Sequence, residues 1–257
     1  MTRRARRRPS PGRPTVSVVV PARDDAPALA RCLELLAVQT VAPLEVVVVD
    51  NGSTDDTARV ARGRGARVVS EPVAGIPQAA SRGYDEARGE VVARLDADSR
   101  PGPRWVERVA DHLDDPTLDA VTGVGVFHDA PIGTRWLLSL LYFGAYYGFT
   151  HLALGHTALW GSSMAFRRAT WLEVRGSVHR DDPELHDDLD LAFVLGPHRR
   201  IRLDPRLSVG VSARSLRGRT QRRRRMDRAR RTLETNWAEQ PPWLRWQDRW
   251  SRPGRGR

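Results

Sequence analysis

The sequence contains no lysine and only one cysteine in 257 residues. All 42 side chains of the Lys/Arg class are arginines, which we interpret first as a bias of genome composition toward arginine codons. A single cysteine excludes an internal disulfide, and with it the small folds that disulfides stabilise. Because Cys32 falls within an apolar helical pattern, we expect a buried thiol in a protein of a reducing compartment.

The sequence also lacks the apolar segment that follows the basic start of a signal peptide. Residues 1–8 are rich in arginine, but residues 9–14 are turn-like, and the apolar run 16–20 is too short for an export signal. We therefore expect residues 1–14 to form a disordered basic arm on a cytoplasmic protein.

Acidic residues are scarce at the ends of the chain rather than in its middle. Six arginines and no acid precede Thr15, and fifteen arginines accompany four acids from Arg214 to Arg257. The formal net charge of the whole chain is +11, so the segment between these ends is net acidic. This distribution argues against a basic nucleic-acid groove within the fold, and we expect no nucleic acid as a partner. It fits arms that contact an anionic surface, and peripheral contact with an anionic membrane is the form we expect.

Apolar runs with strand and helix periodicity alternate along residues 15–213. The expected strands are 16–20, 44–49, 66–70 and 91–95, and the expected helices between and after them are 27–39, 54–62, 76–88 and 103–113. Such alternation with short loops predicts a mostly parallel sheet that is covered by helices on both faces. We divide this domain into two halves, 15–100 and 101–213, with further strands expected at 120–127, 162–168 and 201–211.

Two segments depart from the alternating pattern. Residues 136–154 are a nearly continuous apolar and aromatic run, of marginal length for a membrane span. Its two glycines and its tyrosines favour buried or interfacial helices that line an acceptor site. Residues 214–257 form a basic tail in which four of the eight tryptophans fall within the last twenty-one residues. Trp beside Arg is typical of a helix in a membrane interface, while a solvated arm and a helix packed back on the domain are equally open.

The triplet Asp96-Ala97-Asp98 follows directly after the expected strand 91–95. On an extended chain, residues at i and i+2 project to the same side. Both carboxylates would then lie at the carboxyl edge of the sheet, where open α/β sheets bind their ligands. Hard oxygen ligands at that edge suit Mg²⁺ or Mn²⁺ carrying a diphosphate. The alternative is a solvated acidic turn, since Asp, Ser, Pro and Gly are ordinary loop residues.

Three segments together carry a more specific signal than this triplet alone. The run 19–24 (Val-Val-Pro-Ala-Arg-Asp), the run 48–55 (Val-Val-Asp-Asn-Gly-Ser-Thr-Asp) and the run 95–98 (Leu-Asp-Ala-Asp) resemble the nucleotide half of family 2 glycosyltransferases. The resemblance covers about residues 17–195, and it implies that 15–100 is the nucleotide-binding half and 101–213 the acceptor and catalytic half. It implies the GT-A fold, a Rossmann-like α/β/α sandwich with a mostly parallel central sheet, followed here by a basic helical tail. It also implies a nucleoside diphosphate sugar as donor and a divalent metal, Mg²⁺ or Mn²⁺, as cofactor.

The same resemblance implies roles for individual residues. Nucleotide-sugar contacts are expected at Pro21, Ala22, Asp24, Asp50, Gly52, Arg82 and Asp96. Asp50 would hydrogen-bond the base, as a carboxylate accepts the imide N–H of uracil. Arg82 would lie near the diphosphate. Asp96 would face the ribose or the metal, and Asp98 would ligate the metal directly.

A second acidic group, residues 186–191 (His-Asp-Asp-Leu-Asp-Leu), matches the Glu-Asp-x-Asp/Glu-Leu element of the family. The match makes Asp188 the general base and puts Asp187 in place of the usual glutamate at the catalytic centre. A base on the face opposite the leaving diphosphate deprotonates the attacking hydroxyl, so configuration at the sugar inverts. The alternative is a helix N-terminus rich in Asp, which the helix dipole favours.

The small-residue segment Gly161-Ser162-Ser163 resembles the family's segment before the acceptor site, where close approach requires short side chains. These residues together predict a metal-dependent, hexosyltransferase-like glycosyltransferase. It would move a sugar from a UDP- or GDP-linked donor to a hydroxyl acceptor, either lipid-linked or a small molecule. We expect it in the cytoplasm or at the inner face of the plasma membrane, in the synthesis of cell-envelope glycoconjugates. The open alternatives are a sugar-phosphate nucleotidyltransferase and a non-enzymatic binder of nucleic acid or membrane that acts through its arginine-rich arms.

Overall fold

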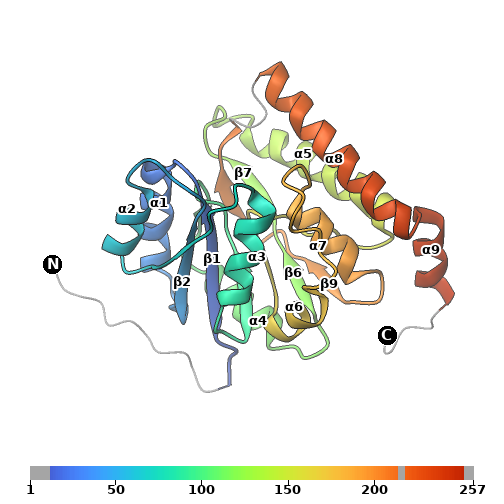
Figure 1. The fold of residues 1–257 in the computed structure, drawn as a ribbon, viewed down its shortest axis with the longest axis horizontal. Helices are drawn as coiled ribbons and strands as arrows, with labels where there is room; N and C mark the ends of the chain where they lie inside the picture. Colours follow the sequence, from blue (N-terminus) through green and yellow to red (C-terminus); the bar gives the residue numbers. More distant parts are fainter. Residues whose placement is uncertain (1–11, 214–217, 252–257) are drawn as a thin grey trace.

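The computed structural model describes residues 12–213 and 218–251 and contains one large and one small β-sheet (Figure 1). The large sheet has seven strands in the order β3-β2-β1-β4-β8-β6-β9. Their bounds are β1 (Val16–Ala22), β2 (Glu45–Asp50), β3 (Arg67–Ser70), β4 (Val91–Arg94), β6 (Ala120–Thr122), β8 (Met164–Arg167) and β9 (Ile201–Leu203). Strand β8 is antiparallel to both of its neighbours, whereas the other pairs are parallel, so the predicted mostly parallel sheet is confirmed.

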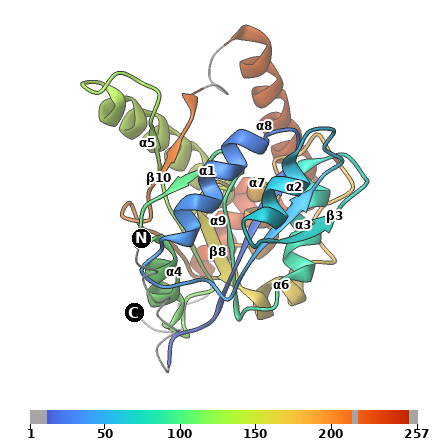
Figure 2. The ribbon, with the colours of Figure 1, turned by 90° about the vertical axis from the view of Figure 1, so that its left-hand side faces the viewer.

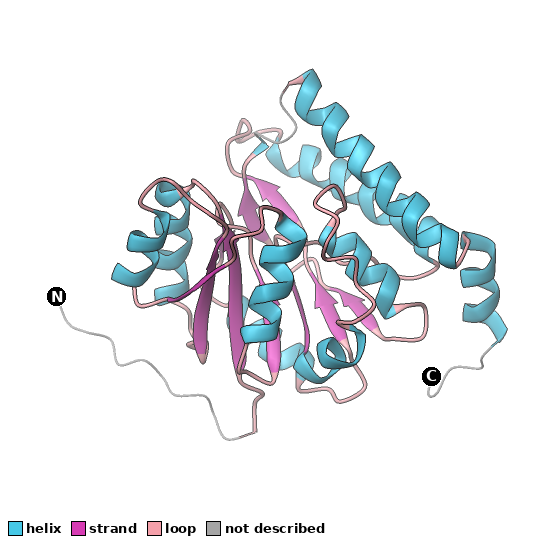
Figure 3. Cartoon of the chain, in the orientation of Figure 1, coloured by secondary structure: helices cyan, strands magenta, loops and turns pink. Residues whose placement is uncertain are grey.

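Helices cover both faces of the large sheet (Figure 3). The side chains of β1 alternate between the cores on these two faces. Val18 and Val20 belong to the core under α1 (Ala26–Ala37) and α4 (Trp105–Leu113). Val19 belongs to the opposite core under α3 (Ile76–Glu86), α6 (Arg168–Val174) and α7 (Asp187–Leu195). Cys32 is fully buried in the first core, as expected.

The predicted strands 120–127 and 201–211 are each split between the two sheets. The small sheet consists of β5 (Arg100–Pro101), β10 (Val209–Val211) and β7 (Gly125–Phe127). The first segment therefore changes sheets between β6 and β7. A side chain at Gly123 would come within 1.8 Å of the Leu207 carbonyl, so the chain crosses over at a residue that only glycine can occupy. Apolar alternation indicates a strand but cannot show that it leaves one sheet for another.

The helix expected over 54–62 begins with neither Ser53 nor Thr54, which belong to the loop after β2. Helix α2 (Thr57–Gly63) begins later, and the two hydroxyls bond to Asp24 in the loop after β1 instead. The Asp24 amide donates to Ser53 Oγ at 3.1 Å, and the Thr54 amide donates to Asp24 Oδ1 at 2.7 Å. The carboxyl ends of β1 and β2 are thus tied together by side chains.

The apolar run 136–154 forms a single helix, α5 (Arg135–Leu154), that stands out from the body beside β7 (Figure 2). Of the two placements that we expected for this run, the buried one is wrong, because only 17% of its most apolar stretch is buried. The interfacial placement stays a prediction. The helix is long and apolar enough to cross a membrane. Phe143 and Leu154 are buried on its inner face. The exposed apolar side chains are Trp136, Leu137, Leu138, Leu140, Leu141, Phe149 and Leu152.

The basic tail forms two helices, α8 (Arg219–Glu239) and α9 (Pro242–Ser251), that pack back on the domain (Figure 1). The last carbonyls of α5 have no partner within their own helix. They accept hydrogen bonds from Trp246 Nε1 (2.9 Å), Trp237 Nε1 (3.2 Å) and Arg245 Nε (2.9 Å). Residues 1–11 of the predicted arm and residues 214–217, where we placed the domain edge, lie outside the described residues.

Candidate active site

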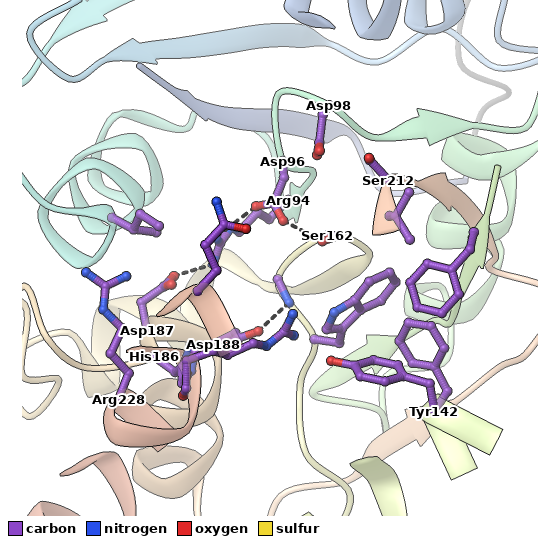
Figure 4. Close-up of a pocket in the computed structure, with 18 of the residues that line it drawn as sticks. Arg94, Asp96, Asp98, Tyr142, Ser162, His186, Asp187, Asp188, Ser212 and Arg228 are labelled. Carbon is purple, nitrogen blue, oxygen red and sulfur yellow. Dashed lines mark hydrogen bonds and ion pairs between the residues drawn. The ribbon is translucent and has the colours of Figure 1, made fainter. Parts of the chain in front are cut away.

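A cavity of about 570 Å³ lies beyond the carboxyl end of β4, and both acidic groups open into it (Figure 4). Asp96 and Asp98 come from the loop after β4, while Asp187 and Asp188 begin α7, roughly ninety residues later in the chain. Aromatic and cationic side chains form the remaining walls. The aromatic side chains are Phe127, Tyr142, Phe143 and Trp160, and the cationic ones are Arg94, Arg224, Arg225 and Arg228.

Arg94, the last residue of β4, joins the two acidic groups. Its side chain is buried, one terminal nitrogen contacts Asp187, and the other lies 3.0 Å from Asp96 Oδ1. Burial alone disfavours the charged guanidinium, but the nearby acidic groups, Asp187 foremost, together outweigh this effect and raise the pKa of Arg94 well above its ordinary value. Burial also raises the pKa of Asp187 to about 7, against the opposing effect of Arg94. The cation therefore fixes the start of α7 to the end of the sheet.

Asp188 occupies the first turn of α7 and is held by backbone donors. Its Oδ2 accepts the Gly161 N–H at 2.7 Å, and its Oδ1 accepts the Leu189 N–H at 2.8 Å. A carboxylate offers about four lone-pair sites, so each oxygen keeps capacity for a further proton. A side chain at Gly161 would come within 2.7 Å of the Arg94 guanidinium, which explains glycine at this position. Asp188 thus faces the cavity in a fixed orientation.

Asp96 and Asp98 differ in what they contact. Asp96 uses one oxygen for Arg94 and accepts a hydrogen bond from the Ser162 hydroxyl with the other, while Asp98 lines the cavity farther from Arg94. Within the described residues no group of three or more His, Cys, Asp or Glu side chains is arranged to hold a metal. Mg²⁺ in nucleotide sites usually has one or two carboxylate ligands, with waters and phosphates completing its shell. Two carboxylates at this edge therefore fit a cation that binds together with a diphosphate.

Only two of the three expected acceptor residues line the cavity. Gly161 and Ser162 line the cavity, whereas Ser163 is fully buried. The Ser163 hydroxyl accepts a hydrogen bond from Trp105 Nε1 at 2.9 Å and donates one to the Leu207 carbonyl at 2.8 Å. Ser163 is therefore a structural residue of the core, and we leave it out of the acceptor site.

Apart from Asp96, the residues expected to contact the nucleotide are not among those that line this cavity. Pro21 and Ala22 at the end of β1 pair in register with Val49 and Asp50 at the end of β2. Asp24 follows in the left-handed region, with φ of 49°, and its hydrogen bond from the Thr54 amide lowers its pKa. Asp50 Oδ1 accepts the Ser53 N–H at 3.2 Å, and Gly52 has φ of 70° in the same turn. They form one cluster at the carboxyl ends of two adjacent strands.

Arg82 is farther from the cavity than the resemblance implies. It lies on α3 more than one and a half turns beyond Ile76, the α3 residue that lines the cavity. Its side chain is half exposed and pairs with Glu86 at 3.1 Å. Its expected contact with the diphosphate stays a prediction.

Sequence reasoning did not single out Arg94 or the arginines of α8. The signal for Arg94 was available, because a lone cation inside an otherwise apolar strand must find buried partners. The α8 arginines gave no such signal, since they stand in a long basic run of which only one face meets the cavity.

Residues 17–174 match the family model described as Glycosyl transferase family 2. The chain belongs to this family. Glycosyltransferase AglE of Haloferax volcanii is 31% identical over 118 residues, which are 43% of this chain and 39% of that protein. Chondroitin synthase of Pasteurella multocida is 34% identical over 114 residues, 42% of this chain and 12% of that protein. The match therefore spans two fifths or less of the length of these relatives.

Solved structures of glycosyltransferases share the fold. Mannosyltransferase PcManGT of Pyrobaculum calidifontis, in complex with GDP-Man and Mn²⁺, aligns with a TM-score of 0.66 at 22% identity, over 93% of this chain and 70% of that one. Glucosyl-3-phosphoglycerate synthase of Mycobacterium tuberculosis, with Mn²⁺, UDP-glucose and phosphoglyceric acid, aligns with a TM-score of 0.54 at 20% identity, over 85% and 80% of the two chains. The GT-A fold expected for this family 2 glycosyltransferase is confirmed.

Proposed function

We propose that this family 2 glycosyltransferase moves one sugar from a UDP- or GDP-linked donor to a hydroxyl acceptor with inversion of configuration. The observation that carries the proposal is the shared cavity of Asp98 and Asp188. In Figure 4 the two carboxylates face the same space from opposite sides, with Asp96 and Arg94 between them. A donor diphosphate on the Asp98 side would leave its anomeric carbon open to attack from the Asp188 side.

Asp188 acts as the general base in this proposal. The acceptor oxygen attacks the anomeric carbon while the bond from that carbon to the diphosphate oxygen breaks. The acceptor proton passes to a free lone pair of Asp188, and the nucleoside diphosphate leaves with the bonding electrons. The Gly161 and Leu189 amides hold the carboxylate in place during this transfer. Asp187 positions α7 through Arg94 rather than touching the substrate.

A divalent cation, Mg²⁺ or Mn²⁺, would be held by Asp98 with Asp96 and would supply charge neutralisation of the leaving diphosphate. The cluster at the ends of β1 and β2 would bind the nucleoside. Asp50 would face the base there, with Pro21, Ala22 and Gly52 along the backbone, and Asp24 would fix the turn. The base and the sugar of the donor are left to experiment.

The rival reactions explain fewer of these features. A sugar-phosphate nucleotidyltransferase normally has a glycine-rich loop with Arg or Lys side chains directly after the first strand. Here residues 21–25 contain one arginine and no glycine, and Asp24 is hydrogen-bonded to Thr54. A scaffold that acts through its arginine-rich arms has no use for Asp188 anchored opposite Asp98. Such a scaffold would keep its binding when both carboxylates are removed.

A donor panel tests the reaction. Nucleoside diphosphate release is measured with Mn²⁺ and with Mg²⁺ for the wild type, Asp98→Ala and Asp188→Asn. We expect hydrolysis or transfer with one donor class and a loss of roughly 10²-fold or more in Asp188→Asn. Nucleotide affinity in the presence of metal should fall in Asp98→Ala and stay unchanged in Asp188→Asn. Equal release by Asp188→Asn and the wild type would remove the assigned base.

We also propose that the enzyme works at an anionic membrane surface, at the cytoplasmic face, on acceptors of the cell envelope. The exposed face of α5 supports this, because residues 136–154 contain no Asp, Glu, Lys or Arg. Contiguous exposed apolar surface of this kind is unusual for a soluble monomer. Trp243 and Trp250 of α9 are also exposed, and the exposed arginines of α8 add charge that suits anionic headgroups.

Vesicle co-sedimentation tests the membrane contact. Leu141→Ser with Phe149→Ser should lower binding to vesicles of phosphatidylglycerol and phosphatidylcholine by roughly tenfold or more, since each side chain loses its burial in lipid. Leu172→Ser is the matched control, because Leu172 is exposed on α6, outside α5 and the tail. Unchanged binding of the double variant would refute the contact. A dimer that dissociates in the double variant would instead assign the α5 face to a second copy.

A further inference from the structure

The basic tail contributes one wall of the cavity. Gln221, Arg224, Arg225 and Arg228 of α8 all line it. Their spacing of i, i+3, i+4 and i+7 puts them on one face of the helix. Farther along α8, Thr232 and Asn236 are buried against α7. One half of this helix is therefore an anchor, and the other half is a polar, cationic surface of the site.

This wall lies on the side of Asp188. The Arg225 carbonyl is 3.2 Å from His186 Nε2, two residues before Asp188, and the Arg225 guanidinium is 5.6 Å from the centre of the Tyr142 ring. In Figure 4 Arg228 lies beside His186 and Asp187, while Asp98 is on the far side of the cavity. A donor diphosphate bound near Asp98 would leave the arginine wall to the acceptor.

Two arginines of this wall share one carboxylate of the neighbouring loop. Glu184 is shared by Arg224, at 3.3 Å, and Arg228, at 3.2 Å. The side chain of Arg224 is 66% exposed and that of Glu184 is 45% exposed, so their pairing adds little to stability, whereas Arg228 is 21% exposed and already oriented along the wall. A guanidinium offers five N–H donors in a planar fork that matches a phosphate group. Tyr142 and Phe143 provide an apolar surface next to it.

Resting on the proposed function, we propose that Arg225 and Arg228 bind a phosphate monoester carried by the acceptor. The phosphate would occupy the arginine fork, and the carbon part would lie on the aromatic wall, which brings the acceptor to Asp188. Both a soluble phosphorylated acceptor and a lipid phosphate present this group. Nothing in the reaction changes, because the arginines orient the acceptor and transfer no proton.

The test measures binding by calorimetry with the donor side filled by the nucleoside diphosphate that binds best with Mn²⁺. Glycerol 3-phosphate is the soluble probe, and farnesyl monophosphate in detergent is the lipid probe. We expect the double variant Arg225→Gln, Arg228→Gln to weaken the binding of one probe by roughly tenfold or more, because charge-assisted hydrogen bonds are lost. Arg223→Gln is the matched control, since its side chain is 86% exposed on the same helix and does not line the cavity.

The outcomes separate the two proposals. Selective weakening of the soluble or the lipid probe supports the phosphate site and tells which source it serves. Weaker nucleoside diphosphate binding in the double variant, with the probes unchanged, would overturn the inference and assign the arginines to the donor. If neither probe binds to the wild type although nucleoside diphosphate does, the phosphate-site inference is overturned and the glycosyltransferase proposal is left intact. No nucleoside diphosphate bound by the wild type would instead count against the proposed function itself.

Discussion

The two acidic groups of the cavity are held in place by different means. Asp96 and Asp98 follow β4, whose four residues are paired on one side with β1 and on the other with β8. Backbone pairing in the sheet fixes where that strand ends. Asp187 and Asp188 begin a helix that is joined to the body by buried side chains instead. Arg94 binds Asp187, Thr232 accepts the His186 N–H, and Asn236 donates to Asp190 at 2.9 Å.

This difference tells where the active site is vulnerable. On the sheet side a substitution must disturb the strand pairing to move a carboxylate. On the helix side, a few buried polar contacts from β4 and from the tail hold the helix that carries the proposed base. Damage to these contacts should lower turnover before it lowers nucleotide binding, if the tail supports the proposed base as these contacts suggest.

Removal of the Arg94 side chain should cause the largest loss of stability and activity among the changes that separate the two sides. Arg94→Met leaves the buried Asp187 without its cation, and breaking a buried pair in this way costs about 3–5 kcal/mol in the free energy of unfolding. Activity should be lost as well, since both acidic groups lose their link. Urea unfolding with a donor-hydrolysis assay measures both. A loss below about 1 kcal/mol would contradict the bridging role.

The pH dependence sharpens this test. Burial raises the pKa of Asp187 to about 7 from its ordinary value of 3.8, so its ionisation in the fold costs stability as the pH rises through that range. Arg94 offsets part of this cost, and without Arg94 the pKa of Asp187 should rise further. The destabilisation of Arg94→Met should therefore be largest above pH 7 and smaller near pH 5, where Asp187 is neutral. Arg94→Lys, which keeps a positive charge, should show a weaker dependence.

A smaller effect is expected from the tail. Asn236→Leu removes a donor to Asp190, which is 2% exposed, and should cost about 1–3 kcal/mol in stability. The kcat should fall roughly tenfold through displacement of Asp188, with the affinity for nucleoside diphosphate unchanged.

Ser17→Ala is the matched control for Asn236→Leu. Ser17 is fully buried in β1, at the end away from the cavity, and bonds to Glu45 and to the Gly89 amide. Its loss should cost similar stability and leave kcat unchanged. If kcat fell equally in both variants, the buried contacts of α7 would have no special role in catalysis, and the proposed difference between the sheet side and the helix side of the cavity would be wrong.

The sheet side could be predicted from the sequence because its determinants are local. Apolar strands followed at once by Asp50 and by Asp96 indicate carboxylates at one edge, and parallel pairing brings those strand ends together. The helix side could not be derived in this way. The residue pattern marks Asp187 and Asp188 as a helix start, but the partners that place them, Arg94 and Asn236, are 93 and about fifty residues away.

The walls of the cavity show the same limit. The sequence of the basic run 222–225 is equally compatible with a solvated arm, a membrane helix or a wall of the site. Only the packing of α8 on the domain determines which face of the helix lines the cavity. The apolar run 136–154 indicates a helix, but its composition cannot show that half of its surface stays uncovered. Periodicity shows what a segment can bury, and only the fold shows whether a partner is available.

The smallest effect is expected on the sheet side, at Arg82. Its half-exposed pair with Glu86 is an i,i+4 contact, so Arg82→Gln should change stability by no more than about 0.5 kcal/mol. If Arg82 leaves Glu86 to bind the diphosphate, the donor KM should rise severalfold at constant kcat, which is the reverse of the Asn236→Leu pattern. Glu86→Gln, which releases Arg82 from its partner, should leave the donor KM unchanged or lower it. A donor KM that is unchanged in Arg82→Gln would make this residue a surface charge and confine diphosphate binding to the Asp98 side of the cavity.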